Sequence, residues 1–220
     1  MGTAVVRNCS NQVNLTGAQN FVGGIVAQME NGEVYNCYTE GDIVISGSGS
    51  TEFGVKANYV GGIVGLMLSG QLYNSYSRAQ VIEGGLNNGG IVGEFRTTDR
   101  GDVICDIQNC WSAGSNNFYG SRKEEIDPDN ADISYFPQLG ASCYSRVTNE
   151  GCGKISSGNY TVDYSVEYVL NTTTNKKEWV QTTDYQNEKL AVPLNAWVGT
   201  HGTKYREWKQ TSESTRPVFN

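Results

Sequence analysis

Short apolar runs of three to five residues alternate with Gly, Asn and Ser through the first half of the chain. The stretch Gly62–Asn74 is an example, and it aligns without a gap on Gly24–Asn36. Runs of this length between turn-forming residues predict short β-strands joined by tight corners, with little room for a helix. We expect Gly to supply positive φ angles at these corners, and Asn to tolerate the left-handed region there.

The pattern also repeats. Gly-Gly-Ile-Val occurs three times, each time followed by Asn, then Cys or Ser, then an aromatic residue: Gly23–Val26 with Asn36–Tyr38, Gly61–Val64 with Asn74–Tyr76, and Gly89–Val92 with Asn109–Trp111. With a partial copy at Asn8–Ser10, successive Asn residues are 28, 38 and 35 positions apart. One unit of 28 residues, with inserts around 46–55 and 96–102, accounts for these spacings. A fixed period of this kind is typical of a solenoid.

Stacked repeats set equivalent residues beside one another, about 4.8 Å apart. The interior ladders are then Ile25, Ile63 and Ile91, and Val34, Leu72 and Ile107. The sequence therefore predicts an all-β fold, a parallel β-solenoid of the β-helix or β-roll type with a small mixed C-terminal cap. We expect the solenoid over residues 1–120, a degenerate repeat and loops over 121–160, and the cap over 161–220.

The motif residues resemble a known family. Gly61–Ser77 reads Gly-Gly-Ile-Val-Gly, then Gly-x-Leu-x-Asn-Ser-Tyr-Ser, and is similar to the GLUG repeat of bacterial surface proteins. The same repeat is found beside the metallopeptidase domain of enzymes that cleave immunoglobulin A. The resemblance covers about residues 5–115. It implies a β-solenoid, an adhesin-like or scaffolding role, and an extracellular or cell-surface location, but no particular ligand.

Charge and hydropathy narrow the choice of partners. The chain carries 16 Lys and Arg against 23 Asp and Glu, a net charge of −7, so it is a poor nucleic-acid binder. No stretch has the length of a transmembrane span, and the first residues lack the apolar core of a signal peptide. Because Val5–Cys9 already reads as the end of a repeat, we expect the chain to belong to a longer exported protein.

Six cysteines raise the question of disulfides. Cys9, Cys37 and Cys110 share one repeat position with Ser75, which indicates a small side chain on an inner turn, so we expect buried thiols there. Ser142–Ser145 looks like a degenerate fourth copy, and a bridge from Cys143 to Cys152 is the alternative. Zinc is not expected, because there is no Cys-x-x-Cys pair and His201 is the single histidine.

Catalytic motifs are also missing. The chain has neither His-Glu-x-x-His nor Gly-x-Ser-x-Gly, and His201 falls in a predicted helix-ending turn. We therefore expect no enzyme activity, no catalytic residue, no metal and no cofactor. Two alternatives stay open. Clustered carboxylates could cleave polysaccharide, the candidates being Asp42, Asp102 and Asp106 with Arg100. The acidic stretch Glu124–Asp132 could bind Ca²⁺, although it departs from the EF-hand pattern.

The last third has a different pattern. It predicts short helices at Val166–Leu170 and Asn187–Val198, the second ended by Gly199, and a hairpin of Lys204–Lys209 with Arg216–Phe219. We expect its large aromatic residues, Trp179, Trp197, Trp208 and Phe219, to pack over the open end of the solenoid.

The leading functional prediction is a non-enzymatic, adhesin-like module that binds a host glycan or an extracellular or matrix protein. Its candidate binding residues are the aromatic residues of the repeats: Tyr35, Tyr38, Tyr73, Tyr76 and Trp111. A structural spacer or stalk in a larger surface protein is the alternative, and a carbohydrate-active β-helix is the third. Exposure of these aromatic side chains would favour glycan binding, and their burial would favour the spacer.

Overall fold

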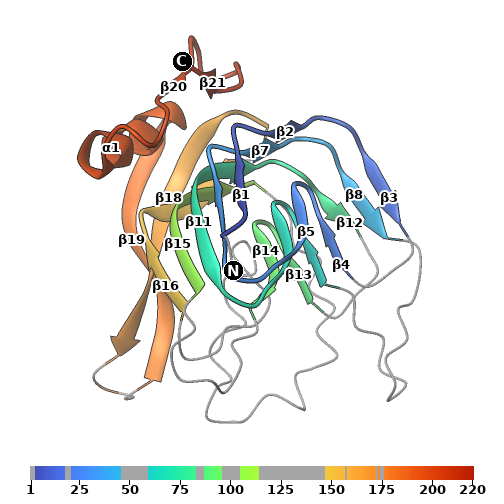
Figure 1. The fold of residues 1–220 in the computed structure, drawn as a ribbon. Helices are drawn as coiled ribbons and strands as arrows, with labels where there is room; N and C mark the ends of the chain where they lie inside the picture. The colour runs from blue at the N-terminus through green and yellow to red at the C-terminus, as the bar shows by residue number, and fades with distance from the viewer. Residues whose placement is uncertain are drawn as a thin grey trace, which may run out of the picture.

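The structure is a computed structural model of the chain, and it describes residues 3–17, 21–45, 59–82, 87–95, 105–113, 147–156, 158–171, 173 and 176–220. Within these ranges the protein is mostly β, with many short parallel strands and one helix (Figure 1). Several predicted features lie outside the described residues: the inserts around 46–55 and 96–102, Arg100, Asp102, Glu124–Asp132, and Ser142–Ser145 with Cys143.

The parallel strands stack in layers. The first layer is β1 (Val5–Arg7), β2 (Ser10–Asn11), β3 (Leu15–Gly17), β4 (Phe21–Gly23) and β5 (Val26–Met29). The second is β6 (Gly32–Tyr35), β7 (Tyr38–Thr39), β8 (Ile43–Ile45), β9 (Tyr59–Gly61) and β10 (Val64–Met67). The third is β11 (Gly70–Ser77), β12 (Val81–Ile82), β13 (Asn87–Gly89) and β14 (Val92–Phe95), and β15 (Cys105–Ser112) begins the fourth. Each strand pairs in parallel with its equivalent in the next layer, as Figure 1 shows.

The predicted ladders are confirmed by the pairing register. Leu72 lies opposite Val34 on one side and Ile107 on the other, and all three side chains are buried. Ile63 and Ile91 are fully buried, and Ile25 is partly buried in the first layer. Burial of these aliphatic side chains supplies the core between the sheets, because each contributes roughly 1.5–3 kcal/mol when removed from water.

The expected positive φ at glycine occurs at Gly70, the first residue of β11, with φ of 112°, but the repeated Gly-Gly pairs have another role. The positive φ angles at the repeated corners belong to Asn, with φ of 53° at Asn36 and 45° at Asn74. The glycines are needed for close approach. A Cβ on Gly61 would lie 1.8 Å from the carbonyl oxygen of Val64, and one on Gly62 would lie 2.0 Å from the carbonyl oxygen of Gly90 in the next layer. Neither position can hold a side chain without moving the backbone.

A fifth layer lies within residues 121–160, where a degenerate repeat is predicted, but its strands come after Ser142–Ser145, the residues predicted to be the degenerate copy. β16 (Val147–Glu150) and β17 (Cys152–Ile155) pair in parallel with β15, so that Trp111 lies opposite Gly153. Gly151, with φ of 62°, occupies the corner that Asn holds in the earlier repeats. The sequence could not locate this corner, because Gly replaces the Asn that marks the motif.

The C-terminal third differs from the prediction in part. The predicted helix at Val166–Leu170 is wrong: β18 (Thr161–Asn171) is antiparallel to both β17 and β19 (Lys176–Lys189). Apolar residues alternate at Val162, Tyr164 and Val166, which is a strand period, and pairing on both edges decides the conformation. These strands extend the main sheet past β17.

The other elements follow more closely. The predicted second helix is confirmed but shifted: α1 spans Ala191–His201, with Pro193 in its first turn, where an amide hydrogen has no helical partner. It ends at Gly202, with φ of 88°, and not at Gly199. The terminal hairpin is also confirmed, as β20 (Trp208–Lys209) paired antiparallel with β21 (Val218–Phe219).

We predict that Ile63→Asp unfolds the protein. Ile63 is fully buried in the main core, so the substitution places an unpaired carboxylate in an apolar ladder at a cost of several kcal/mol. Val5→Asp is the matched control, because Val5 also lies in the layered strands but is 50% exposed. Urea unfolding followed by circular dichroism measures both. A stable Ile63→Asp variant would contradict the assignment of the interior ladder.

Candidate functional site

An asparagine ladder runs along one corner of the layers. Asn8, Asn36, Asn74 and Asn109 all have left-handed backbones, with φ between 45° and 55°. Each side-chain amide donates to the amide oxygen one layer below: Asn36 to Asn8 at 3.1 Å, Asn74 to Asn36 at 2.8 Å, and Asn109 to Asn74 at 2.9 Å. Asn is suited to this corner because its side chain tolerates the left-handed region and bonds along the stack.

The residue after each Asn closes the corner with a second repeated hydrogen bond. The thiol or hydroxyl donates to the carbonyl two residues earlier: Cys9 to Arg7 at 3.2 Å, Cys37 to Tyr35 at 3.3 Å, Ser75 to Tyr73 at 2.8 Å, and Cys110 to Gln108 at 3.4 Å. Cys and Ser are interchangeable here because both are small and can donate. Burial raises the pKa of Cys37 to about 12, so its thiol stays protonated. The expectation of buried thiols is confirmed for Cys37 and Cys110, whereas Cys9, in the first layer, is partly exposed.

The predicted binding residues lie in register in two sets beside the asparagine ladder, Tyr35 with Tyr73, and Tyr38 with Tyr76 and Trp111. We call these five residues together the aromatic row. Tyr38 and Tyr76 stack with ring centroids 5.2 Å apart and planes 7° apart. The five side chains are not an exposed face. Their exposed fractions lie between 0% and 7%, so in this structure they are not available to a ligand.

The C-terminal segment, residues 190–220, covers the aromatic row. Trp197 packs on Tyr73 at 6.0 Å between ring centroids, and Tyr205 meets both Tyr35 and Tyr73 edge-on. Farther along, Trp208 lies 5.2 Å from Tyr76, and Phe219 lies 5.9 Å from Tyr38. Tyr185 of β19 covers Trp111.

The large aromatic residues of the C-terminal segment do not pack over the open end of the layers, where they were predicted. Trp197, Trp208 and Phe219 pack on the side of the layers, whereas β16 to β19 follow β15 in the main sheet. The side chain of Trp179 is outside the described residues.

Backbone groups of the same segment complete the asparagine ladder. Asn74 donates to the carbonyl of Arg206, and Asn109 donates to the carbonyl of Leu194, each at 3.0 Å. In return, the indole N–H of Trp208 donates to the amide oxygen of Asn74 at 2.9 Å. Both Asn side chains are fully buried, so the segment satisfies donors that would otherwise be unpaired.

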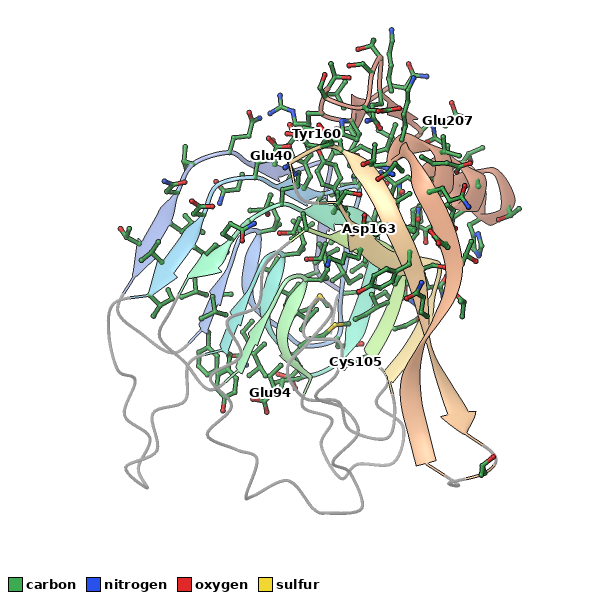
Figure 2. The ribbon with its side chains drawn as sticks, turned by 180° about the vertical axis from the view of Figure 1, so that it is seen from behind. Glu40, Glu94, Cys105, Tyr160, Asp163 and Glu207 are labelled. Carbon is green, nitrogen blue, oxygen red and sulfur yellow. The ribbon has the colours of Figure 1, made fainter. Side chains whose placement is uncertain are left out.

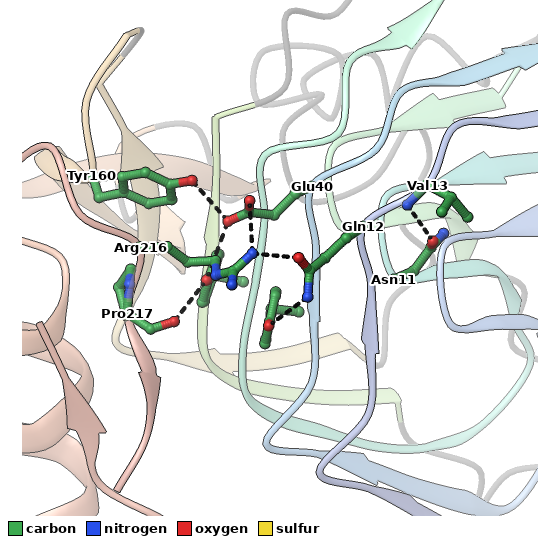
Figure 3. A network of polar contacts seen from close by, with 9 residues as sticks. Asn11, Gln12, Val13, Glu40, Tyr160, Arg216 and Pro217 are labelled. Carbon is green, nitrogen blue, oxygen red and sulfur yellow. Dashed lines mark hydrogen bonds and ion pairs between the residues drawn. The ribbon is translucent and has the colours of Figure 1, made fainter.

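A polar network pins the end of the segment, and Glu40 lies at its centre (Figure 3). The Tyr160 hydroxyl donates to Glu40 at 2.9 Å, and the Arg216 guanidinium lies 3.5 Å from the same carboxylate. Figure 2 shows Glu40 and Tyr160 close together below the C-terminal segment. Arg216 also donates to Gln12 at 2.6 Å, and the hydroxyl of Tyr76 donates to the carbonyl of Pro217 at 3.0 Å. Burial raises the pKa of Tyr76 well above its usual range, which keeps this phenol a donor.

The candidate catalytic groups have separate structural partners. Asp42 accepts from the backbone of Gln80 at 3.3 Å, and Asp106 accepts from Gln108 and from the hydroxyl of Tyr73. The ring of His201 stacks on Trp197 at 4.0 Å, and its Nδ1 lies 2.8 Å from the Trp197 carbonyl. Over the described ranges, no three His, Cys, Asp or Glu side chains are grouped to hold a metal ion. In the same ranges no helix is long and apolar enough to span a membrane.

A shallow polar hollow of about 370 Å³ is the other surface feature. It is lined by Asn159, Lys189, Thr211, Ser212, Glu213 and Ser214. The sequence analysis did not find it, because its residues come from three separate segments and share no motif. The partners of the asparagine ladder were missed for the same reason, since two of them are backbone carbonyls.

Comparison with known proteins adds one similarity. No family model matches the chain, and no curated protein matches it. Among solved structures, the chain is similar to a putative immunoglobulin A1 protease from Bacteroides ovatus, with a TM-score of 0.44 and 16% sequence identity. The match covers 98% of this chain and 74% of that one.

We predict that Asn74→Asp destabilises the protein by on the order of 3 kcal/mol at neutral pH. The new carboxylate oxygen would face the Asn36 amide oxygen and the Arg206 carbonyl, where Asn74 now donates. The folded-state pKa of this Asp would be raised, so the loss should shrink as the pH falls toward about 4, where the carboxyl regains a proton to donate.

Asn8→Asp is the control for this experiment. Asn8 lies exposed at the end of the ladder and only accepts from Asn36, which a carboxylate does equally well. Its effect should stay within about 0.5 kcal/mol. Equal losses for the two variants in urea unfolding would show that the ladder does not hold the corner.

Proposed function

We propose that this chain is a non-enzymatic β-solenoid module that acts as a spacer in a larger bacterial surface or secreted protein. The observation that carries the proposal is the burial of the whole aromatic row under the C-terminal segment. The residues best suited to stack on a sugar are already used for contacts within the chain. These residues attach the C-terminal segment to the layered strands.

The layered strands support this role. Among the described residues, parallel pairing joins the first three layers along four sheets and the later layers along the main sheet, so a pull along the stack is shared by many backbone hydrogen bonds. The GLUG-like motif residues support the solenoid and the extracellular location, because the repeat they resemble occurs in bacterial surface proteins. The rest of a longer parent chain is then the partner of this module.

An adhesin-like module is the second candidate function, and the polar hollow is the observation that favours it. Its lining of hydroxyl, amide and charged side chains can hydrogen-bond to a glycan or to an extracellular protein. The hollow is separate from the aromatic row, so the two proposals are tested on different residues.

We predict that the full chain gives no saturable binding on an array of glycans and extracellular-matrix proteins. The reason is that the aromatic side chains are less than 8% exposed. Saturable binding would contradict the spacer. Ser212→Trp would then locate it: binding lost through this filling of the hollow assigns the adhesin role to that site, and binding lost only through Tyr38→Ala assigns it to the aromatic row.

We also predict that removing residues 190–220 makes the protein aggregate or lose its cooperative melting. The cut exposes Tyr35, Tyr38, Tyr73 and Tyr76 together and leaves Asn74 and Asn109 without their carbonyl partners. Light scattering and thermal melting measure the effect. Lys209→Ala is the control, because Lys209 lies in the same segment but is exposed. A soluble truncated chain that melts like the full one would contradict the stabilising role of the segment.

A further inference from the structure

Four cysteines occupy one column inside the layers. The pairs Arg7–Tyr35 and Ser10–Tyr38 are in register, which sets Cys9 opposite Cys37. The pairs Gln108–Glu150 and Trp111–Gly153 are in register, which sets Cys110 opposite Cys152. Ser75 lies directly opposite Cys110, in the layer between Cys37 and Cys110. We call these five residues the cysteine column: Cys9, Cys37, Ser75, Cys110 and Cys152.

The serine divides the column into two separate pairs. Neighbouring parallel strands lie about 4.8 Å apart, which falls inside the range of about 4.4–6.8 Å between the Cα atoms of a disulfide. Cys37 and Cys110 are two layers apart, about 9.6 Å by the same spacing, which is too far for a bridge. Only Cys9 with Cys37, and Cys110 with Cys152, are neighbours within the column.

Two of the side chains also lean in the required direction. The Cys37 sulfur lies 4.0 Å from the carbonyl of Val6 in the first layer, the layer of Cys9. The Cys152 sulfur lies 3.7 Å from the carbonyl of Ile107 in the fourth layer, the layer of Cys110. Cys37 and Cys152 therefore lean toward the layers of Cys9 and Cys110. The Cys110 sulfur leans the same way along the stack, 3.4 Å from the carbonyl of Leu72 in the third layer, so this side chain has to rotate for its bridge to form.

We propose that the cysteine column is a pair of disulfide sites, Cys9–Cys37 and Cys110–Cys152, oxidised by a small-molecule or protein disulfide. In each site one thiolate attacks the oxidant's S–S bond and forms a mixed disulfide, and one thiol of the oxidant leaves. The second cysteine loses its proton, attacks its partner's sulfur and releases the second thiol. Two protein thiols become one disulfide, and one oxidant disulfide becomes two thiols.

The two sites join the first pair and the last pair of parallel layers in the main sheet. The first layer has no strand beyond it among the described residues, and it exposes Val5 at 50%, Val13 at 65% and Phe21 at 40%. Cys9–Cys37 would tie this layer to the second. Cys110–Cys152 would tie the fourth layer to β17, the strand on which β18 pairs. The first bridge limits fraying of the first layer, and both bridges restrict the unfolded chain. The oxidant in the cell would come from the oxidising surroundings of the proposed surface location. The disulfide chemistry itself can be tested on purified protein, whatever its location.

Burial makes the two sites react at different stages. Cys9 is partly exposed, whereas Cys37, Cys110 and Cys152 are fully buried. Burial also raises the pKa of Cys110, so few thiolates form there in the folded protein. An oxidant added to folded protein therefore reaches Cys9 first, and the Cys110–Cys152 pair is accessible only before the fifth layer has closed.

The test starts from the reduced full chain and uses oxidised glutathione as the oxidant. Folded protein should lose 2 Da through one bridge, and refolding from urea with the same oxidant should give a loss of 4 Da, read by intact mass spectrometry of chain freed from mixed disulfides. Peptide mapping should find Cys9–Cys37 in both samples and Cys110–Cys152 in the refolded one. The doubly bridged chain should melt several degrees higher than the reduced one.

Two internal controls sharpen the result. Cys105 is buried but lies opposite Gly70 and Val147, so it should stay reduced. In Cys9→Ser, Cys37 should stay reduced and should not pair with Cys110. A chain that refolds with oxidised glutathione and keeps all its thiols would overturn the proposal. A Cys143–Cys152 peptide would overturn the second site, and a Cys37–Cys110 peptide would overturn the register. None of these outcomes touches the spacer function, which the binding array tests separately.

Discussion

The structure depends on how one buried side chain is satisfied at a left-handed corner. A buried primary amide has two donors and one acceptor oxygen, and leaving any of them unpaired costs about 1–3 kcal/mol. At Asn74 the amide oxygen of Asn36 in the preceding layer takes one donor, the Arg206 carbonyl takes the other, and the oxygen accepts from Asn109 and from the Trp208 indole. The corner, the stacking and the attachment of the C-terminal segment are therefore one hydrogen-bonded unit.

This unit also sets the register between layers. A slip by one residue would move Cys37 or Tyr35 into the left-handed position, which Asn adopts more readily than either. It would also break the hydrogen bonds between the Asn side chains of successive layers. The same slip would bring a side chain to the position of Gly62, where a Cβ would lie only 2.0 Å from the carbonyl oxygen of Gly90. Apolar burial alone would tolerate several alignments of short Val and Ile runs. The Asn and Gly positions remove that freedom, which is why these two motifs mark the repeat.

The sequence could therefore predict most of what repeats. The ladders through Leu72 and Ile63, the shared place of Cys37 and Ser75, and the parallel strands all follow from spacing, because the same local interaction is made several times. What occurs once was harder to predict. In the fifth layer Gly151 occupies the corner that Asn holds elsewhere, so the motif is not recognisable there. The short apolar run of β18 fits both the helical and the strand period, and only its pairing with β17 and β19 makes it a strand. The cover over the aromatic row rests on contacts more than 100 residues apart in sequence, such as Asn74 with Arg206.

The burial of the aromatic row changes what those residues mean for function. Tyr and Trp combine a large apolar ring with a polar group, so a repeated row of them is equally suited to a sugar or to another part of the chain. The polar groups decide between these roles here. The Tyr76 hydroxyl donates to Pro217, Tyr38 accepts from Gln12, and the Trp111 indole donates to Asn109, so the hydrogen-bonding groups that a sugar would need already have partners. A ligand at this row would have to displace both the rings and the hydrogen bonds of the C-terminal segment, and would recover only contacts of the same kind. The rings and polar groups of the row are therefore already used within the chain, which is the reason for proposing a spacer.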